Sequence, residues 1–251
     1  CSNGKMNDLI IALYREKDSL RLLEKYSRKY QYRLIIYNKG GLKVKSSLFK
    51  NINLPNIGLH THSYIYHIVK NYETLSEVTI FLLGSAFRDI KKERKAKWIL
   101  ENGNKCKGFM AQHIWLSDEI DYEFELPYYE VLDYSKRWLH ANSKRIKTKM
   151  IRAENKPLGK WIEKNTNYTL QNKRFLRSNK CIFAAHKSLI QAKPLSYWEN
   201  LLSQVNKESE DVRNLEVVHY FERAWLSIFI SNPSIEKLQH DISTYGPINF
   251  F

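Results

Sequence analysis

The sequence predicts an α/β fold in which helices flank a mostly parallel central sheet. Val78–Leu83 is a continuous apolar, β-rich run, which is typical of a strand covered on both faces. Residues 8–14 and 32–37 are two further apolar runs, separated by a helical stretch at a spacing that suits a right-handed βαβ crossover. The 251 residues, 43% of them hydrophobic, are enough to bury the core of one large domain.

The first half is predicted to follow the order strand, helix, strand, helix, strand. The helix after residues 8–14 has Leu20, Leu23 and Tyr26 on its inner face. The strand at 32–37 ends in Asn38-Lys39-Gly40-Gly41, a turn that needs positive φ. Ligands of α/β folds bind at the carboxyl ends of the strands. We therefore expect Tyr14, Asn38, Lys39, Gly84 and Ser85 to contact a ligand.

The segment before Val78–Leu83 is predicted to be a turn and a helix with an unusual polar face. Pro55 and Gly58 favour the turn. The apolar stripe of the helix follows the spacing i, i+3, i+4, i+7 and consists of Ile65, Ile68, Val69 and Tyr72. The neighbouring face, at offsets 0, 3, 4 and 7, consists of His60, Ser63, Tyr64 and His67. This polar face is expected to contact the ligand.

The second half is less regular. We expect a charged, solvated helix within 86–107, a strand at 109–116 and a mixed helix at 128–140. A short helix around 158–164 and a strand at 181–185 follow, and then helices at 186–191, 194–205 and 214–230. No internal repeat or flexible linker divides the chain, so one domain spanning 6–251 is expected. Residues 1–5 are interpreted as an expression remnant ahead of an initiator at Met6, and 142–180 as a mobile basic segment.

Charge and cysteine content limit the classes of partner without choosing one. The 41 Lys and Arg outnumber the 26 Asp and Glu, which gives a formal charge of +15. Nucleic acid, an anionic membrane surface and a phosphorylated small molecule all attract such a chain, although AT-rich codon usage would produce the same bias. Three cysteines without a CxxC pair support neither a zinc ribbon nor a disulfide framework. No apolar run reaches the length of a membrane span, and a cytoplasmic location fits best.

The sequence gives little support for a phosphate-binding loop, a histidine metal site or an acidic metal site. Neither a GxGxxG loop nor a P-loop is present. His60, His62 and His67 lack a nearby third ligand, so we expect hydrogen bonding or phosphate contact from them and no metal. The acidic cluster of Asp118, Glu119 and Asp121 is expected to be a solvated loop.

Glu222 is the most informative charged residue. It lies beside the apolar face formed by Phe221, Trp225 and Ile228 in a helix of bulky side chains. Two interpretations are open: a structural ion pair, for example with Arg223, or a general base whose pKa is raised by burial.

Several blocks resemble an uncharacterised family of bacterial, fungal and algal-virus proteins found among polysaccharide-synthesis genes. The family pattern is YNKG, then LPN-(V/I)-G-R-E, a helix with H-T-Y-L-x-H-I and N-Y, and a strand V-T-I-F-L-Q-G. The matching blocks are 37–40, 54–58, 62–64, 67–68, 71–72 and 78–82. The chain departs from the pattern at Leu59-His60, where the family has Arg-Glu, and at Leu83, where it has Gln. The resemblance covers about residues 8–85 and, more weakly, 181–230.

The later part is similar to the C-terminal half of inverting glycosyltransferases of the core-2 branching type. The similarity lies in a short strand, the Tyr197-Trp198 pair and a helix with Glu-x-x-Trp. Those enzymes have a Rossmann-like GT-A fold and need no metal, and the Glu of this motif deprotonates the acceptor hydroxyl. The resemblance implies that Glu222 is the base here. It also implies that Lys and Arg stabilise the leaving nucleoside diphosphate, with Arg174, Arg177, Lys173, Lys237 and His240 as candidates.

The predicted function is therefore an inverting, metal-independent glycosyltransferase without a cofactor. It would transfer sugar from a nucleotide sugar to a glycan or lipid-linked precursor of capsule or lipopolysaccharide, with a peripheral contact to the anionic inner membrane face. The donor site is expected to include Tyr14, Asn38, Lys39, His60, Ser63, Tyr64, His67, Gly84, Ser85, Arg174 and Arg177. The alternatives are a basic nucleic-acid-binding protein or nuclease, although no specific nucleic-acid signature is present, and a catalytically inactive relative.

Overall fold

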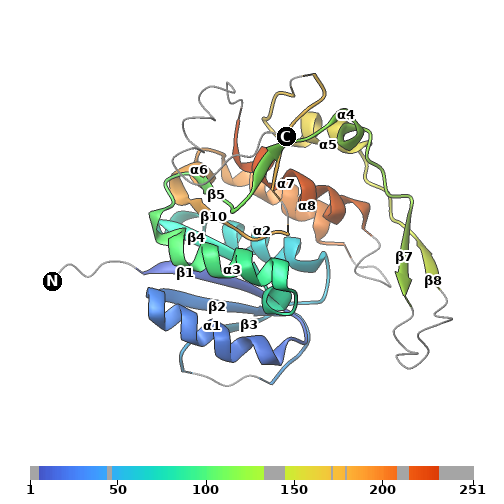
Figure 1. The fold of residues 1–251 in the computed structure, drawn as a ribbon. Coiled ribbons are helices and arrows are strands. Elements are labelled where there is room, and N and C mark those ends of the chain that lie inside the picture. Colours follow the sequence, from blue (N-terminus) through green and yellow to red (C-terminus); the bar gives the residue numbers. More distant parts are fainter. Residues whose placement is uncertain are drawn as a thin grey trace.

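The computed structural model describes residues 6–43, 47–132, 145–170, 172–178, 180–207 and 215–231. Its centre is a six-stranded sheet in the order β3-β2-β1-β4-β10-β5 (Figure 1). The strands are β1 (Asn7–Leu13), β2 (Tyr32–Asn38), β3 (Lys50–Asn53), β4 (Val78–Leu83), β5 (Phe109–Met110) and β10 (Phe183–His186). β1 to β4 are mutually parallel, whereas β10 is antiparallel to both of its neighbours. The expected mixed α/β fold with a mostly parallel sheet is confirmed.

Alternate residues of the central strands are buried on opposite faces of the sheet. Leu9, Ile11 and Leu13 of β1 pack into one core, together with α1 (Lys17–Tyr30) and α3 (Ile90–Asn102). Ile10 packs into the other core, which includes α2 (Leu59–Asn71), α7 (Leu195–Val205) and α8 (Glu216–Phe229). Because both faces are covered, β1, β2 and β4 read as continuous apolar runs in the sequence.

The strand order creates a switch point between β1 and β4. From β1 the chain moves outward through β2 to β3, and it then returns to place β4 on the other side of β1. Such a reversal leaves a crevice beyond the carboxyl ends of the two strands. Here Tyr14 follows β1, and the 3-10 turn Gly84–Phe87 follows β4. At the nearby end of β2, Gly41 has φ of +63°, as expected for this turn, and a Cβ on Gly40 would lie 1.6 Å from the carbonyl oxygen of Tyr14.

Two expectations for the second half are wrong. Residues 109–116 do not form one strand, because β5 joins the central sheet whereas β6 (Ile114–Leu116) pairs with β9 (Leu176–Ser178) in a separate two-stranded sheet. Residues 128–132 form the strand β7 (Tyr128–Leu132) and not a helix, because they pair with β8 (Arg145–Lys149). Residues 133–140 lie outside the described residues. In Figure 1, β7 and β8 extend away from the body of the molecule.

The helices α5 (Leu158–Asn165) and α6 (Lys187–Gln191) lie close to their expected positions, whereas the short helix α4 (Glu119–Tyr122) lies where a solvated loop is expected. Two further 3-10 turns are Tyr72–Thr74 and Gly103–Lys105. Much of the segment expected to be mobile is packed, since Leu158, Trp161, Ile162 and Phe175 belong to the same core as α8. Within the described part of the chain, no helix has both the length and the apolar character needed to cross a membrane.

Candidate functional site

A hollow of about 280 Å³ opens beyond the carboxyl end of β4. Its wall combines one carboxylate, one imidazole, one thiol and four cationic side chains contributed by several separate elements. The lining residues are His60, Leu83, Lys92, Arg177, Lys180, Cys181, Glu222 and Arg223. Parallel α/β sheets bind ligands at this edge, which makes the hollow the candidate functional site.

Glu222 contributes the carboxylate of the hollow from the middle of α8. Its side chain is 36% exposed, and its Oε2 lies 3.8 Å from Nδ1 of His219, one turn earlier. Burial raises the pKa of Glu222, but His219, His60 and Arg223 beside it together hold the pKa below its ordinary value. Of the two interpretations open for Glu222, a base with a raised pKa is therefore not supported, and the carboxylate is ionised at neutral pH.

His60 reaches the same hollow from the first turn of α2. The turn before it uses left-handed backbone, with φ of +56° at Gly58 and +49° at Leu59. Burial lowers the pKa of His60 to about 4, so the ring is neutral at pH 7. Its Nε2 is buried and has no hydrogen-bond partner among the residues that the structure describes. A buried ring nitrogen without a partner is available for a ligand.

The four cations give the hollow an excess of positive charge. They are Lys92 of α3, Arg177 of β9, Lys180 before β10 and Arg223 of α8. Arg177 forms an ion pair with Asp121 and lies 5.3 Å above the ring of Trp115. Arg223 lies 3.7 Å above the ring of Phe124 and donates a hydrogen bond to the carbonyl of His219 at 3.0 Å. A concave surface with several fixed cations attracts phosphates and other anions.

Cys181 forms part of the wall between the cations and the carboxylate. Lys180 and Cys181 have left-handed φ values of +72° and +52°, and the hydroxyl of Tyr64 donates to the Cys181 carbonyl at 3.1 Å. Burial raises the pKa of the Cys181 thiol well above its usual range, and the charge of Glu222 raises it further. The thiol is therefore protonated and a poor nucleophile.

The structure brings only some of the expected donor contacts together. His60, Arg177 and the base candidate Glu222 share the hollow, whereas Arg174 is exposed and does not line it. Ser63, Tyr64 and His67 are fully buried in the core, so they do not form the expected ligand-facing surface with His60. This face of α2 packs against the sheet. The hydroxyl of Tyr64 donates to the carbonyl of Cys181, and His67 Nδ1 lies 3.0 Å from the hydroxyl of Tyr37 on β2.

The expected contacts at the ends of β1 and β2 already have partners within the chain. Lys39 donates to the carbonyls of Ile57 and Leu59, and Asn38 exchanges hydrogen bonds with the backbone of Leu42. The backbone N–H of Tyr14 donates to Glu16 Oε2 at 2.8 Å, and a Cβ on Gly84 would lie 2.7 Å from the same oxygen. Gly84 and Ser85 begin the 3-10 turn that follows β4. Lys237 and His240 lie outside the described residues.

Sequence reasoning missed Lys92, Lys180, Cys181 and Arg223 as members of one site. Lys92 belongs to a helix that reads as uniformly charged, and the left-handed turn at Lys180 and Cys181 has no glycine to mark it.

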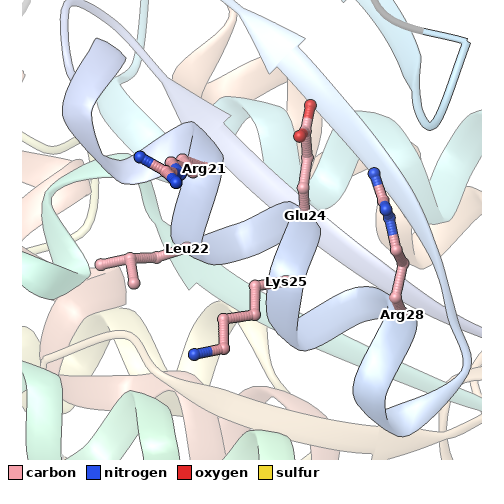
Figure 2. A pocket seen from close by; sticks show the side chains of 5 residues that line it. All are labelled: Arg21, Leu22, Glu24, Lys25 and Arg28. Carbon is pink, nitrogen blue, oxygen red and sulfur yellow. The ribbon is translucent and has the colours of Figure 1, made fainter.

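Two other features carry no site. The acidic cluster forms α4, where Asp118 accepts from the backbone N–H of Asp121 at 2.9 Å and Asp121 neutralises Arg177. A second hollow lies along α1 and is lined by Arg21, Leu22, Glu24, Lys25 and Arg28 (Figure 2). All five side chains come from one helix, and none of them lines the candidate functional site.

Searches with the whole chain find no matching family model and no significantly similar curated protein.

Proposed function

We propose that the protein is a glycosyltransferase with a GT-A-like domain that transfers sugar from a nucleotide sugar to a glycan or lipid-linked precursor of capsule or lipopolysaccharide. The observation that carries this proposal is the juxtaposition of Glu222 with four cations in one hollow at the carboxyl edge of the sheet. A transfer with inversion needs those two components on opposite sides of the reacting carbon: a base for the acceptor and positive charge for the leaving group.

In the proposed reaction, Glu222 takes the proton of an acceptor hydroxyl as its oxygen attacks the anomeric carbon of the donor. The new C–O bond forms while the bond from that carbon to the diphosphate oxygen breaks, and the electron pair leaves with the nucleoside diphosphate. Lys92, Arg177, Lys180 and Arg223 stabilise the negative charge that accumulates on the diphosphate. The arrangement supplies this charge from side chains, which supports transfer without a resident metal.

Packing around α8 supports the assignment of Glu222 as the base. Trp225, the aromatic residue of the Glu-x-x-Trp motif, is fully buried, with its ring centroid 5.8 Å from that of Tyr64 and 5.1 Å from that of Phe183. These contacts join α8 to α2, which contributes His60 to the hollow, and to β10, which follows Cys181 in the chain. A base must be held within hydrogen-bond reach of its substrate, and a rigid helix provides that precision.

A thermal-shift screen of nucleoside diphosphate sugars, with EDTA and with manganese, tests the proposal. We expect at least one nucleotide sugar to raise the melting temperature by the same amount in EDTA as in manganese. Arg177→Gln should reduce that shift because it removes a cation from the hollow. Arg28→Gln, in the hollow on α1, is the matched control and should leave the shift unchanged. No stabilisation by any nucleotide sugar, or an equal shift in Arg177→Gln, would contradict the proposal.

A further inference from the structure

Three side chains with different donor atoms converge in the hollow from separate parts of the chain. His60 belongs to α2, Cys181 precedes β10 and Glu222 belongs to α8. One potential ligand atom of each lies within 4.8 Å of the other two. We propose that these three residues form a binding site for a thiophilic divalent transition metal, with Zn²⁺ as the best-matched ion.

The donor set selects the class of metal. Imidazole nitrogen, thiolate sulfur and carboxylate oxygen are the three ligand types of protein-bound zinc, whereas Mg²⁺ and Ca²⁺ take oxygen ligands. Zinc bonds of about 2.0–2.3 Å in a tetrahedron place ligand atoms about 3.3–3.8 Å apart. Because the three atoms lie within 4.8 Å of one another, they must approach by no more than about 1–1.5 Å, which side-chain rotation can supply. A fourth position is left facing the hollow.

Each ligand is held where a metal can reach it. His60 Nε2 is buried and has no hydrogen-bond partner among the described residues, so a metal would satisfy it. The backbone of Cys181 is fixed by the hydroxyl of Tyr64, and Glu222 is held on a helix packed through Trp225. The three ligands come from α2, from the turn before β10 and from α8, so metal binding would tie these three parts of the chain together.

The surrounding cations lower the affinity of the site for zinc and favour an anion as the fourth ligand. Zinc binding displaces the thiol proton of Cys181, so the charge of the hollow rises by one and not by two. Lys92, Lys180 and Arg223 oppose that increase, and we therefore expect weaker binding than at closed zinc sites made of four protein ligands. An anion at the open position offsets the added charge, so inorganic phosphate should strengthen binding.

This inference goes beyond the proposed function and needs only the geometry of the three ligands. A metal bound to Glu222 would occupy the proposed base, so zinc would act as an inhibitor of transfer and not as its cofactor. The test below measures binding alone, and its outcome is independent of whether the protein transfers sugar.

Cobalt titration of the full chain tests the site, because a cobalt–thiolate bond gives a charge-transfer absorption that reports the sulfur ligand directly. We expect a single equivalent of Co²⁺ to produce this absorption and an equivalent of Zn²⁺ to abolish it. The absorption should persist in the Cys1→Ser/Cys106→Ser double variant, which leaves Cys181 as the one remaining cysteine of the three. It should be absent in Cys181→Ser.

His60→Gln is the second variant and guards against misfolding of the first. We expect it to keep the thiolate absorption but to weaken Co²⁺ binding at least tenfold, and thermal melting of each variant will establish that it is folded. The proposal is overturned if no stoichiometric cobalt–thiolate absorption appears in the wild type. It is equally overturned if the absorption survives in folded Cys181→Ser, or if folded His60→Gln binds Co²⁺ as tightly as the wild type.

Discussion

Glu216 and Glu222 are two carboxylates on the same helix with opposite surroundings. Glu216 is fully buried and accepts hydrogen bonds from the backbone N–H groups of Leu126 at 2.7 Å and Ala153 at 2.8 Å. Arg152 Nε donates at 2.8 Å and the hydroxyl of Tyr220 at 3.1 Å. Within the described part of the chain, Glu222 has fewer partners, and it lines the hollow. One carboxylate joins α8 to the segments before it, and the other is left available for a ligand.

Replacing Glu216 with alanine should destabilise the fold strongly. The change removes one of the two carboxylates paired with Arg152, which keeps Glu125, and it leaves the backbone N–H groups of Leu126 and Ala153 without their acceptor. We expect the free energy of unfolding to fall by about 3 kcal/mol, at the low end for breaking a buried pair because the Arg152 side chain is 29% exposed. Urea unfolding measures this loss. Glu199→Ala, on the exposed face of α7, should change stability by less than about 0.5 kcal/mol; equal effects of the two substitutions would argue against the buried network.

At the scale of elements, the start of α2 requires glycine at position 58 both for its backbone conformation and for its close contact with α7. Gly58 has φ of +56°, and a Cβ at this position would lie 2.5 Å from the carbonyl oxygen of Val205 on α7. Gly41 has a similar φ of +63° but no atom of the described residues within 4 Å of its Cβ position. A comparison of Gly41 with Gly58 therefore separates the effect of backbone strain on stability from the effect of steric contact with α7.

Both glycine-to-alanine substitutions should reduce stability, but by different amounts. Gly41→Ala should cost about 1 kcal/mol through its left-handed backbone alone. Gly58→Ala should cost at least about 1 kcal/mol more, because α2 must also shift away from α7. Chemical denaturation of both variants measures the difference, and equal losses would mean that the α2–α7 contact is not tight.

The buried histidine in the middle of α2 should make the fold sensitive to acid. Burial lowers the pKa of His67 to about 4, although Asp8 of β1 lies 3.8 Å away and acts in the opposite direction. The charges of Arg33 of β2 and Lys50 of β3 lower this pKa further. The unfolded chain binds this proton near pH 6.5 and the folded chain only near pH 4. The free energy of unfolding should therefore fall as pH drops from about 6.5 to 4, by up to about 3 kcal/mol from this residue.

Urea unfolding between pH 7 and pH 4.5 checks this dependence. His67→Gln removes the titrating ring, so the loss of stability between these two pH values should become smaller than in the wild type. His113→Gln replaces an exposed histidine and should alter the pH dependence much less. An unchanged acid dependence in His67→Gln would show that its buried ring is not the cause.

Most of the helices and strands could be predicted because the burial of each one leaves a pattern of apolar residues in its own sequence. β4 was predictable to the residue, since a strand covered on both faces must be apolar throughout. Residues 128–132 were not, because their pairing with 145–149 depends on a distant segment. In the site, Glu222 could be found as a charge in an apolar helix. The left-handed turn at Lys180 and Cys181 could not, because tertiary packing and not residue type selects it.

At the scale of the whole molecule, the charge of +15 should direct the protein to anionic surfaces. We propose a membrane carrying a lipid-linked acceptor, so the protein should sediment with vesicles containing anionic lipid and not with neutral vesicles. The bound fraction should fall as salt rises, because the attraction is electrostatic. Tighter binding to a generic oligonucleotide than to anionic vesicles at the same ionic strength would favour a nucleic-acid partner instead.

The central claim is that Glu222 deprotonates the acceptor, and Glu222→Gln tests it most directly. The substitution preserves size and removes the basic oxygen. With a nucleotide sugar identified by thermal shift, we expect the transfer rate to fall by about 10²–10⁴-fold while the donor-induced shift is retained. Glu199→Gln should transfer at the wild-type rate. Transfer by folded Glu222→Gln at a rate close to that of the wild type would contradict the claim.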